Sequence, residues 1–145
     1  MIQEEIFGDM FKSDCQTLAI PVNQVGTLGN GLARYAKVRW PFINAIYQRH
    51  CSNKTFRTKL VAIPIPNTGK QLLLLPTKNH WKEDSNEFLI SHSLSILARD
   101  YKELNIQSLA LPKIGCGKGH MDFNKVQELI YKHLDPLPIP VKIYI

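Results

Sequence analysis

Residues 22–33 read VNQVGTLGNGLA, a stretch that leaves an apolar run and enters a helix through three glycines and two asparagines. Glycine adopts positive φ at little steric cost and lets a ligand approach the backbone closely. A helix that begins near Gly31 directs its unpaired N–H groups and the positive end of its dipole toward this loop. The stretch therefore predicts a strand, a glycine-rich loop and a helix that together can hold an anion.

A second segment, residues 109–119, repeats this arrangement late in the chain. It reads LALPKIGCGKG, in which a buried-strand pattern breaks into Gly115-x-Gly117-x-Gly119 ahead of a helix. A Walker A loop needs Gly-Lys followed by Ser or Thr, and a Rossmann loop needs GxGxxG early in a domain, so neither motif fits. Taken alone, these glycines could make no more than a tight turn. Two such loops in one small domain indicate a single anionic ligand held between them.

The rest of the chain alternates strand and helix patterns. Apolar runs bounded by turn residues predict strands at residues 1–10, 14–22, 59–66, 71–76, 109–112 and 141–145. Helical spacing predicts helices at residues 31–38, 42–51, 85–104 and 124–134. The alternation predicts an α/β fold with a mixed, mainly parallel sheet. In such sheets ligands bind at the carboxyl ends of the strands, where both glycine loops lie.

Local signals refine these elements. Residues 59–66 and 71–76 flank a short turn and predict a hairpin, whose first strand lies at an edge because Pro64 and Pro66 cannot donate to a ladder. Asp84 with Glu87 can cap the 85–104 helix, whose expected apolar face includes Phe88. The cap of the last helix is Asp122 or Asn124.

Composition bounds the class of protein. A chain of 145 residues with 44% apolar content predicts one globular domain over residues 1–145. The net charge of +6 favours polyanionic partners, a diphosphate or a nucleic acid, although Lys and Arg can equally serve to solubilise the surface. Three widely spaced cysteines show no metal or CxxC pattern, and residues 1–5 lack the basic character of a secretory signal. We therefore expect a cytoplasmic protein with no metal and no contact with a membrane.

Four motifs together resemble the macrodomain family over nearly the whole chain. They are Gly8-Asp9, Asn23 followed by Gly29-x-Gly31-Leu32-Ala33, the run at residues 111–117, and Thr77-Lys78-x-His80-Trp81. The last motif is similar to the branch that holds the antitoxin-type DNA ADP-ribosyl glycohydrolases and, more distantly, the human terminal ADP-ribose protein glycohydrolase. The resemblance implies a three-layer α/β/α macrodomain fold, ADP-ribose as ligand, no cofactor and a monomer.

The resemblance also implies the roles of individual residues. Asp9 would bind the adenine amino group, Asn23 would act at the distal ribose, and the two glycine loops would wrap that ribose and the diphosphate. The implied ADP-ribose ligands are Asp9, Met10, Asn23, Gly29, Asn30, Gly31, Leu32, Ala33, Thr77, Gly115, Cys116, Gly117, Lys118 and Gly119. Asp9 could instead cap a turn, and Cys116 is more readily a small packing residue than a nucleophile. The aromatic residue that stacks on adenine stays open between Phe123 and Tyr144.

Lys78 is the residue to which the resemblance assigns the chemistry, with Asn23 beside it. An isolated lysine in a polar loop is ordinarily a solvated surface residue. Placed at the anomeric carbon of ADP-ribose, a neutral amine can attack that carbon or form a Schiff base, and desolvation and nearby positive charge favour the neutral form. His80 and Trp81 could shape the pocket wall, although Trp81 could equally belong to the core.

Three positions depart from the family pattern. Ile20 stands where the first loop usually carries an earlier asparagine, and Asn30 stands where relatives often have lysine. The catalytic aspartate of the human enzyme matches Gly119 here. The antitoxin-type members also lack that aspartate, so its absence favours their grouping.

These observations predict an ADP-ribosyl glycohydrolase that acts on an N- or O-glycosidic linkage. The expected substrate is thymidine-linked ADP-ribose on DNA, followed by an ester to a protein carboxylate. A reader module that binds ADP-ribose without turnover and an ADP-ribose 1″-phosphate phosphatase are the alternatives. Lys78 favours the glycohydrolase, because a reader does not need it.

Overall fold

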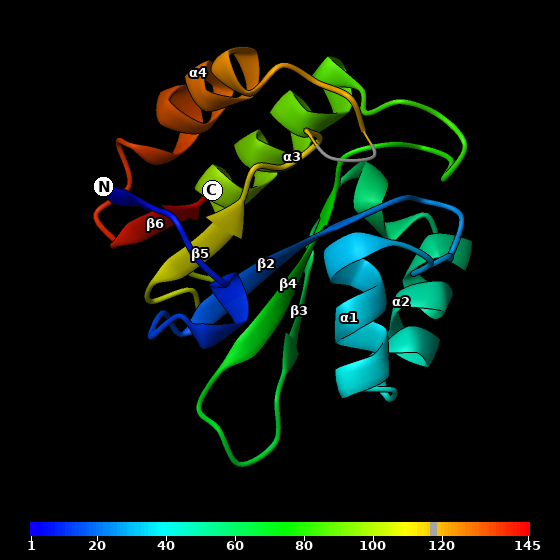
Figure 1. Cartoon of the computed structure of the whole chain (residues 1–145). Coiled ribbons are helices and arrows are strands. Elements are labelled where there is room, and N and C mark those ends of the chain that lie inside the picture. The colour runs from blue at the N-terminus through cyan, green and yellow to red at the C-terminus, as the bar shows by residue number, and fades with distance from the viewer. Residues whose placement is uncertain (117–118) are drawn as a thin grey trace.

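A six-stranded sheet forms the centre of the molecule, with helices packed on both of its faces (Figure 1). The computed structural model describes residues 1–116 and 119–145. Its strands are β1 (Ile2–Ile6), β2 (Thr17–Val22), β3 (Val61–Pro64), β4 (Gln71–Pro76), β5 (Leu109–Pro112) and β6 (Val141–Tyr144). Its α-helices are α1 (Gly31–Arg39), α2 (Ile43–Ser52), α3 (Glu87–Asp100) and α4 (Phe123–Leu134), and two 3₁₀ turns are η1 (Met10–Lys12) and η2 (Thr55–Arg57).

The sheet runs in the order β1-β6-β5-β2-β4-β3. All of these neighbouring strands pair in parallel except β3 and β4, which form the antiparallel hairpin. The predicted mixed, mainly parallel sheet is confirmed. The predicted edge position of the strand that contains Pro64 is also confirmed, since β3 is the last strand in the sheet order. Proline has no backbone N–H to donate, and no further described strand pairs with β3 on its outer side.

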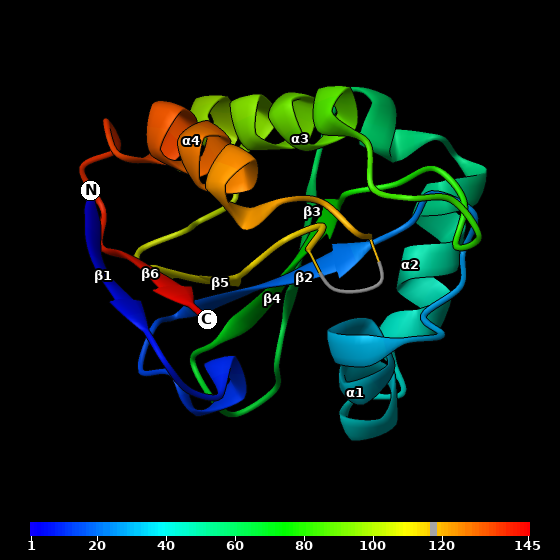
Figure 2. The ribbon, with the colours of Figure 1, turned by 45° about the horizontal axis from the view of Figure 1, so that its top comes forward.

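The layers follow from which strands are apolar along their whole length. Every residue of β4 is buried, and Leu72 to Leu75 are fully inaccessible to solvent. A strand buried on both faces needs helices on both sides, which α3 and α4 provide on one face and α1 and α2 on the other (Figure 2). Burial of each of those leucine side chains stabilises the fold by about 1.5–3 kcal/mol.

Two expectations about the long helix were wrong. The helix begins at Glu87 and its cap is Asn86, whose Oδ1 accepts a hydrogen bond from the Leu89 N–H at 3.2 Å. Asp84 stands two residues before this cap position, and its carboxylate pairs instead with His120 Nδ1 at 2.8 Å. Phe88 is 86% exposed, since a helix that starts at Glu87 turns its second residue to solvent and faces Ile90, Leu94 and Leu97 inward.

The first strand was expected at residues 1–10 but ends at Ile6, because Asp9 caps η1 and turns the chain there. Features of the later helices agree with the sequence patterns. Asp122 caps α4 by accepting from the Asn124 N–H at 3.1 Å. The first helical stretch breaks around Pro41 into α1 and α2, because proline interrupts a helix interior. Within residues 1–116 and 119–145, none of the helices combines the length and the apolar character needed to cross a bilayer.

Candidate functional site

A cleft of about 530 Å³ lies where the parallel strands end. Carboxyl ends of parallel strands meet at one edge of a sheet, so the segments that follow β1, β2, β4, β5 and β6 all reach it. Its described lining comes from residues within 8–10, 21–33, 77–81, 112–116 and 144–145, together with Gly119. The volume falls within the range typical of small-ligand sites, about 300–1,000 Å³.

The structure brings the sequence-predicted residues together in this cleft. They are Asp9, Met10, Asn23, Gly29, Asn30, Gly31, Leu32, Ala33, Thr77, Lys78, Gly115, Cys116 and Gly119. Gly117 and Lys118 lie outside the described residues. Of the two aromatic candidates, Tyr144 lines the cleft, whereas Phe123 lies beneath the Lys113 ammonium, 5.1 Å from its ring centroid.

Several lining residues were not singled out from the sequence. They are Pro21, Val22, Thr27, Pro112, Lys113 and Ile145. Most stand at or just after the last residue of a parallel strand, so the carboxyl-end rule could have identified them.

Trp81 is 44% exposed and lines the cleft, which makes it a wall residue and not part of the core. His80 packs its ring against Trp81, with centroids 5.2 Å apart.

Asn23 organises the first glycine loop through its side chain. Its Oδ1 accepts from the Val25 N–H at 3.1 Å, the Thr27 N–H at 3.4 Å and the Tyr47 hydroxyl at 2.7 Å. Its Nδ2 donates to the Thr27 carbonyl at 2.7 Å. Burial raises the pKa of Tyr47, so its hydroxyl keeps its proton and remains a donor. Asn23 is 5% exposed, and its amide fixes the shape of the loop.

The start of α1 is open to an anionic ligand. Gly31 has φ of 53°, a conformation that favours glycine, and it begins the helix. Asn30 precedes it as the N-cap but makes no side-chain capping hydrogen bond. The first turn contains no acidic residue. The N–H groups at the helix start are therefore available to the cleft, where they and the helix dipole favour negative charge.

The two described glycines of the second loop, Gly115 and Gly119, are closely packed. Gly115 has φ of 78°, and a Cβ placed there would lie 2.9 Å from Ile90 Cδ1. A Cβ at Gly119 would lie 1.9 Å from Ser85 Oγ and 2.5 Å from the Gly115 carbonyl oxygen. An aspartate therefore cannot occupy position 119 without moving the loop, which gives a physical reason for the departure from the human enzyme's pattern. Burial raises the pKa of the Cys116 thiol, which suits a packing residue better than a nucleophile.

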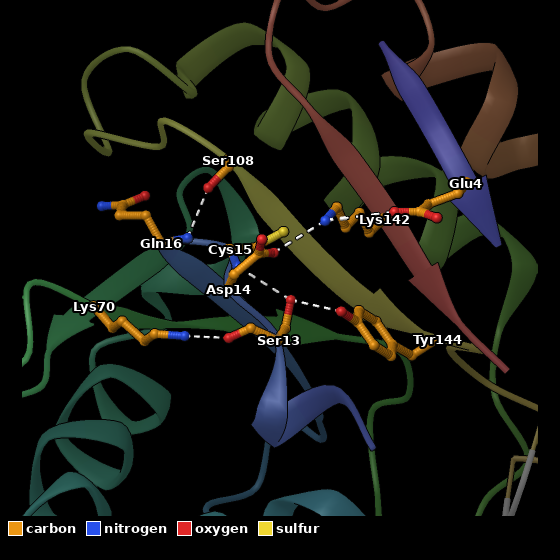
Figure 3. Close-up of polar contacts among 9 residues, drawn as sticks. All are labelled: Glu4, Ser13, Asp14, Cys15, Gln16, Lys70, Ser108, Lys142 and Tyr144. Atoms are coloured by element: carbon orange, nitrogen blue, oxygen red, sulfur yellow. Dashed lines mark hydrogen bonds and ion pairs between the residues drawn. The ribbon is translucent and has the colours of Figure 1, made fainter. Parts of the chain in front are cut away.

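Asp9 and Tyr144 also line the cleft and are held by polar contacts. Asp9 Oδ1 accepts from the Phe11 N–H at 2.9 Å and so caps η1, and the residue also lines the cleft. The Tyr144 hydroxyl donates to Ser13 Oγ at 2.7 Å (Figure 3). In the same network the Lys70 ammonium donates to the Ser13 carbonyl. These contacts tie the segment after η1 to the end of β6.

Lys78 is held between two anchored neighbours. The Thr77 N–H donates to the Val22 carbonyl at 2.9 Å, and the Thr77 carbonyl accepts from the Asn86 N–H at 2.9 Å. The Asn79 carbonyl accepts from the Gln24 N–H at 3.0 Å. The loop after β4 is thus joined to the loop after β2, and half-buried Lys78 faces the same cleft as both glycine loops. Among the described residues, no cluster of His, Cys, Asp and Glu suited to a metal ion occurs.

A family model and curated proteins both match this chain in sequence. A family model described as Macro domain matches residues 19–130. A "DNA ADP-ribosyl transferase-DNA ADP-ribosyl glycohydrolase fusion protein" of Thermosipho africanus is 35% identical, over 95% of this chain and 40% of that protein. The chain spans about two fifths of the length of the curated relatives it matches.

Solved structures agree with the sequence matches. The macrodomain of Mycobacterium tuberculosis DarG superposes with a TM-score of 0.91 at 31% identity, covering 99% of this chain and 97% of that one. Thermosipho africanus DarTG in complex with ADP-ribose superposes with a TM-score of 0.88 at 36% identity, covering 94% of this chain and 39% of that one. With the family match over most of the chain, a three-layer α/β/α fold and a cleft built from two glycine loops, the chain belongs to the macrodomain family.

Proposed function

We propose that this macrodomain binds ADP-ribose in the cleft and hydrolyses the bond that joins it to a modified macromolecule, with thymidine in DNA as the acceptor. The observation that carries the proposal is that Lys78 lines the same cleft as the two glycine loops. A module that only reads ADP-ribose requires the loops, whereas the chemistry requires a reactive group at the distal ribose.

The shape and charge of the cleft support ADP-ribose as the ligand. The diphosphate carries two negative charges, which the start of α1 and the backbone of the second loop can accept between them. Asp9 lines the cleft and would receive the adenine amino group, and Tyr144 supplies an aromatic residue to the same lining. A relative of 36% identity has been solved with ADP-ribose bound, according to its description.

Lys78 would perform the chemistry at the anomeric carbon of the distal ribose. In its neutral form the amine attacks that carbon, a C–N bond forms, and the bond to the acceptor breaks with its electron pair. The acceptor atom takes up a proton, and water then releases ADP-ribose and restores the lysine. The anchored neighbours Thr77 and Asn79 would keep the amine in place.

Asn23 would contribute as a positioning residue. Its amide is engaged with Val25, Thr27 and Tyr47, so it would hold the loop that surrounds the distal ribose. Its loss would therefore weaken binding and turnover together.

The acceptor is inferred from the relatives. Those of 32–35% identity are named as enzymes of DNA ADP-ribosyl glycohydrolysis, and the net charge of +6 is compatible with a DNA substrate. The same kinship would make the protein antitoxin-like in its activity. No membrane partner or cofactor enters the proposal.

The test compares Lys78→Ala with Lys132→Ala, which removes the same charge from an exposed position on α4. On an oligonucleotide ADP-ribosylated at thymidine, we expect Lys78→Ala to lower the rate of ADP-ribose release at least about 100-fold. Calorimetry should show that it still binds free ADP-ribose, whereas Asn23→Ala should lose affinity as well as rate.

The control Lys132→Ala should match the unmodified protein in both measurements. If the unmodified protein binds ADP-ribose but releases none from DNA, the reader function is supported and the glycohydrolase proposal is wrong. If Lys78→Ala releases ADP-ribose at an unchanged rate, Lys78 has no role in the chemistry.

A further inference from the structure

A second hollow of about 500 Å³, here called the side cavity, lies beside the cleft. It is formed by residues 24–25, the end of α2, η2, Asn79 and the first half of α3. The reaction proposed above uses none of these side chains. Its position and chemistry suggest a role in holding the part of the substrate that is not ADP-ribose.

The side cavity and the cleft share a wall. Asn23 and Lys78 line the cleft, and the next residues along the chain, Gln24 and Asn79, line the side cavity. Two hydrogen bonds join these two residues. Gln24 Nε2 donates to Asn79 Oδ1 at 2.6 Å, and the Gln24 backbone N–H donates to the Asn79 carbonyl at 3.0 Å. Neighbouring Cα atoms are about 3.8 Å apart, so the side cavity begins one residue away from Lys78.

The side cavity is cationic. Lys54 and Arg57 line it with exposed side chains, and its described lining contains no Asp or Glu. In residues 1–116 and 119–145, neither cation takes part in an ion pair. The backbone places them firmly, because Lys54 is the N-cap of η2 and the Arg57 carbonyl is 2.8 Å from His92 Nε2.

The side cavity also offers apolar surface. Val25 is 50% exposed, and Leu89 is partly exposed on the first turn of α3. Cations beside an apolar surface suit a nucleotide, whose phosphate needs positive charge and whose base needs an apolar or stacking contact. A protein acceptor has no regularly spaced phosphate for Lys54 and Arg57 to bind.

Resting on the proposed function, we propose that the side cavity binds the DNA strand next to the modified nucleotide, with its phosphate held by Lys54 and Arg57. The acceptor leaves the cleft at Lys78, and a strand carries one phosphate for about every 3.4 Å of helix axis. A phosphate that flanks the modified nucleotide would then lie at the wall of Gln24 and Asn79, beside the side cavity. This subsite distinguishes a DNA strand from a single modified nucleoside.

The experiment compares two double variants with the same change of charge. Lys54→Gln/Arg57→Gln removes both cations of the side cavity, and Lys102→Gln/Lys132→Gln removes two exposed lysines elsewhere. Each is assayed on an ADP-ribosylated single-stranded oligonucleotide and on ADP-ribosylated thymidine nucleoside. Binding of the unmodified oligonucleotide is measured alongside, and thermal unfolding verifies the fold.

For the side-cavity variant we expect kcat/KM on the oligonucleotide to fall about tenfold at low salt, mainly through KM, with the nucleoside unaffected. The logarithm of oligonucleotide affinity should also fall less steeply with the logarithm of salt concentration, by about 1.4 for two lost phosphate contacts. In the control variant, kcat/KM on the oligonucleotide and the affinity for the unmodified oligonucleotide should each change by less than about twofold.

The outcomes separate this inference from the proposed function. Unchanged oligonucleotide binding in the side-cavity variant, or an equal loss on oligonucleotide and nucleoside, would overturn the subsite. If the unmodified protein releases no ADP-ribose from either substrate, the glycohydrolase proposal is wrong, and the binding measurement still tests the subsite. A preference for ADP-ribosylated protein that depends on Lys54 and Arg57 would assign the side cavity to a different acceptor and overturn the inference.

Discussion

Gly119 shows how one residue restricts the chemistry that the cleft can host. A side chain at this position meets Ser85 Oγ and the Gly115 carbonyl oxygen, and the second of these is backbone that cannot rotate away. A lysine–aspartate pair at this place would therefore need a different loop. The chemistry proposed for Lys78 therefore does without that carboxylate.

Gly119→Ala should lower the free energy of unfolding by about 1–3 kcal/mol, the usual cost of forcing atoms into a packed region. Adding Ser85→Gly to Gly119→Ala should restore part of the lost free energy of unfolding, because the Ser85 contact disappears while the Gly115 contact stays. Gly8→Ala is the matched control, since a Cβ there would meet only Ile6 Cγ2 at an ordinary 3.8 Å. Urea unfolding measures all three variants, and a Gly119→Ala protein as stable as the unmodified one would contradict the packing argument.

Asn23 illustrates what sequence could and could not predict about a site residue. Its position between a buried strand and a glycine loop placed it at the cleft, because that pattern is local in the chain. Its contact with Tyr47 comes from α2, which packs against the loop only in the folded molecule. The side cavity escaped prediction for the same reason, since its walls come from several separate segments.

The start of α3 depends on Asn86 and not on Asp84. Asn86 also donates its N–H to the Thr77 carbonyl beside Lys78, so the helix start and the loop that carries Lys78 are joined. Asn86→Ala should reduce the free energy of unfolding by about 1 kcal/mol, the typical loss of an N-cap. Asp84→Ala should change it by less than about 0.5 kcal/mol, because its pair with His120 is largely exposed.

Chemical denaturation of these two variants gives the comparison directly. Equal losses, or a larger loss for Asp84→Ala, would show that the cap has been assigned to the wrong residue.

The order and type of the elements were predictable because strand and helix patterns lie within single segments. The cap was not, because its choice depends on distant contacts: the Asn86 N–H donates to the Thr77 carbonyl, and the Asp84 carboxylate pairs with His120, which follows 36 residues later.

In the molecule as a whole, stability should decline as the pH falls below neutrality. Burial lowers the pKa of His50 and of His133, with the charges of Arg49 and Lys132 adding to the effect. The unfolded chain then binds protons that the folded protein excludes, so stability is full above the unfolded pKa of about 6.5 and is lost as the pH falls. His50→Gln/His133→Gln should lose less stability than the unmodified protein between pH 7.5 and pH 5.5.

Thermal unfolding across that pH range provides the measurement. His133 lies 3.2 Å from Ser91 Oγ, between α4 and α3, so its protonation acts on the packing of one helical layer. The ion pairs of Asp14 and Asp100 lower the pKa of each carboxyl, so their contribution is lost only at more acidic pH. A stability that rises on acidification, or an identical slope in the double variant, would contradict this assignment.

The cleft, the two glycine loops and Lys78 combine into one claim, that the molecule removes ADP-ribose from DNA. The direct measurement is the kcat/KM for release of ADP-ribose from three substrates presented in parallel: a thymidine-modified oligonucleotide, a protein carboxylate ester and ADP-ribose 1″-phosphate. We expect the oligonucleotide to give the highest value, with all release from it abolished or strongly reduced in Lys78→Ala. A higher value for either of the other substrates, or no release from DNA at all, would contradict the claim.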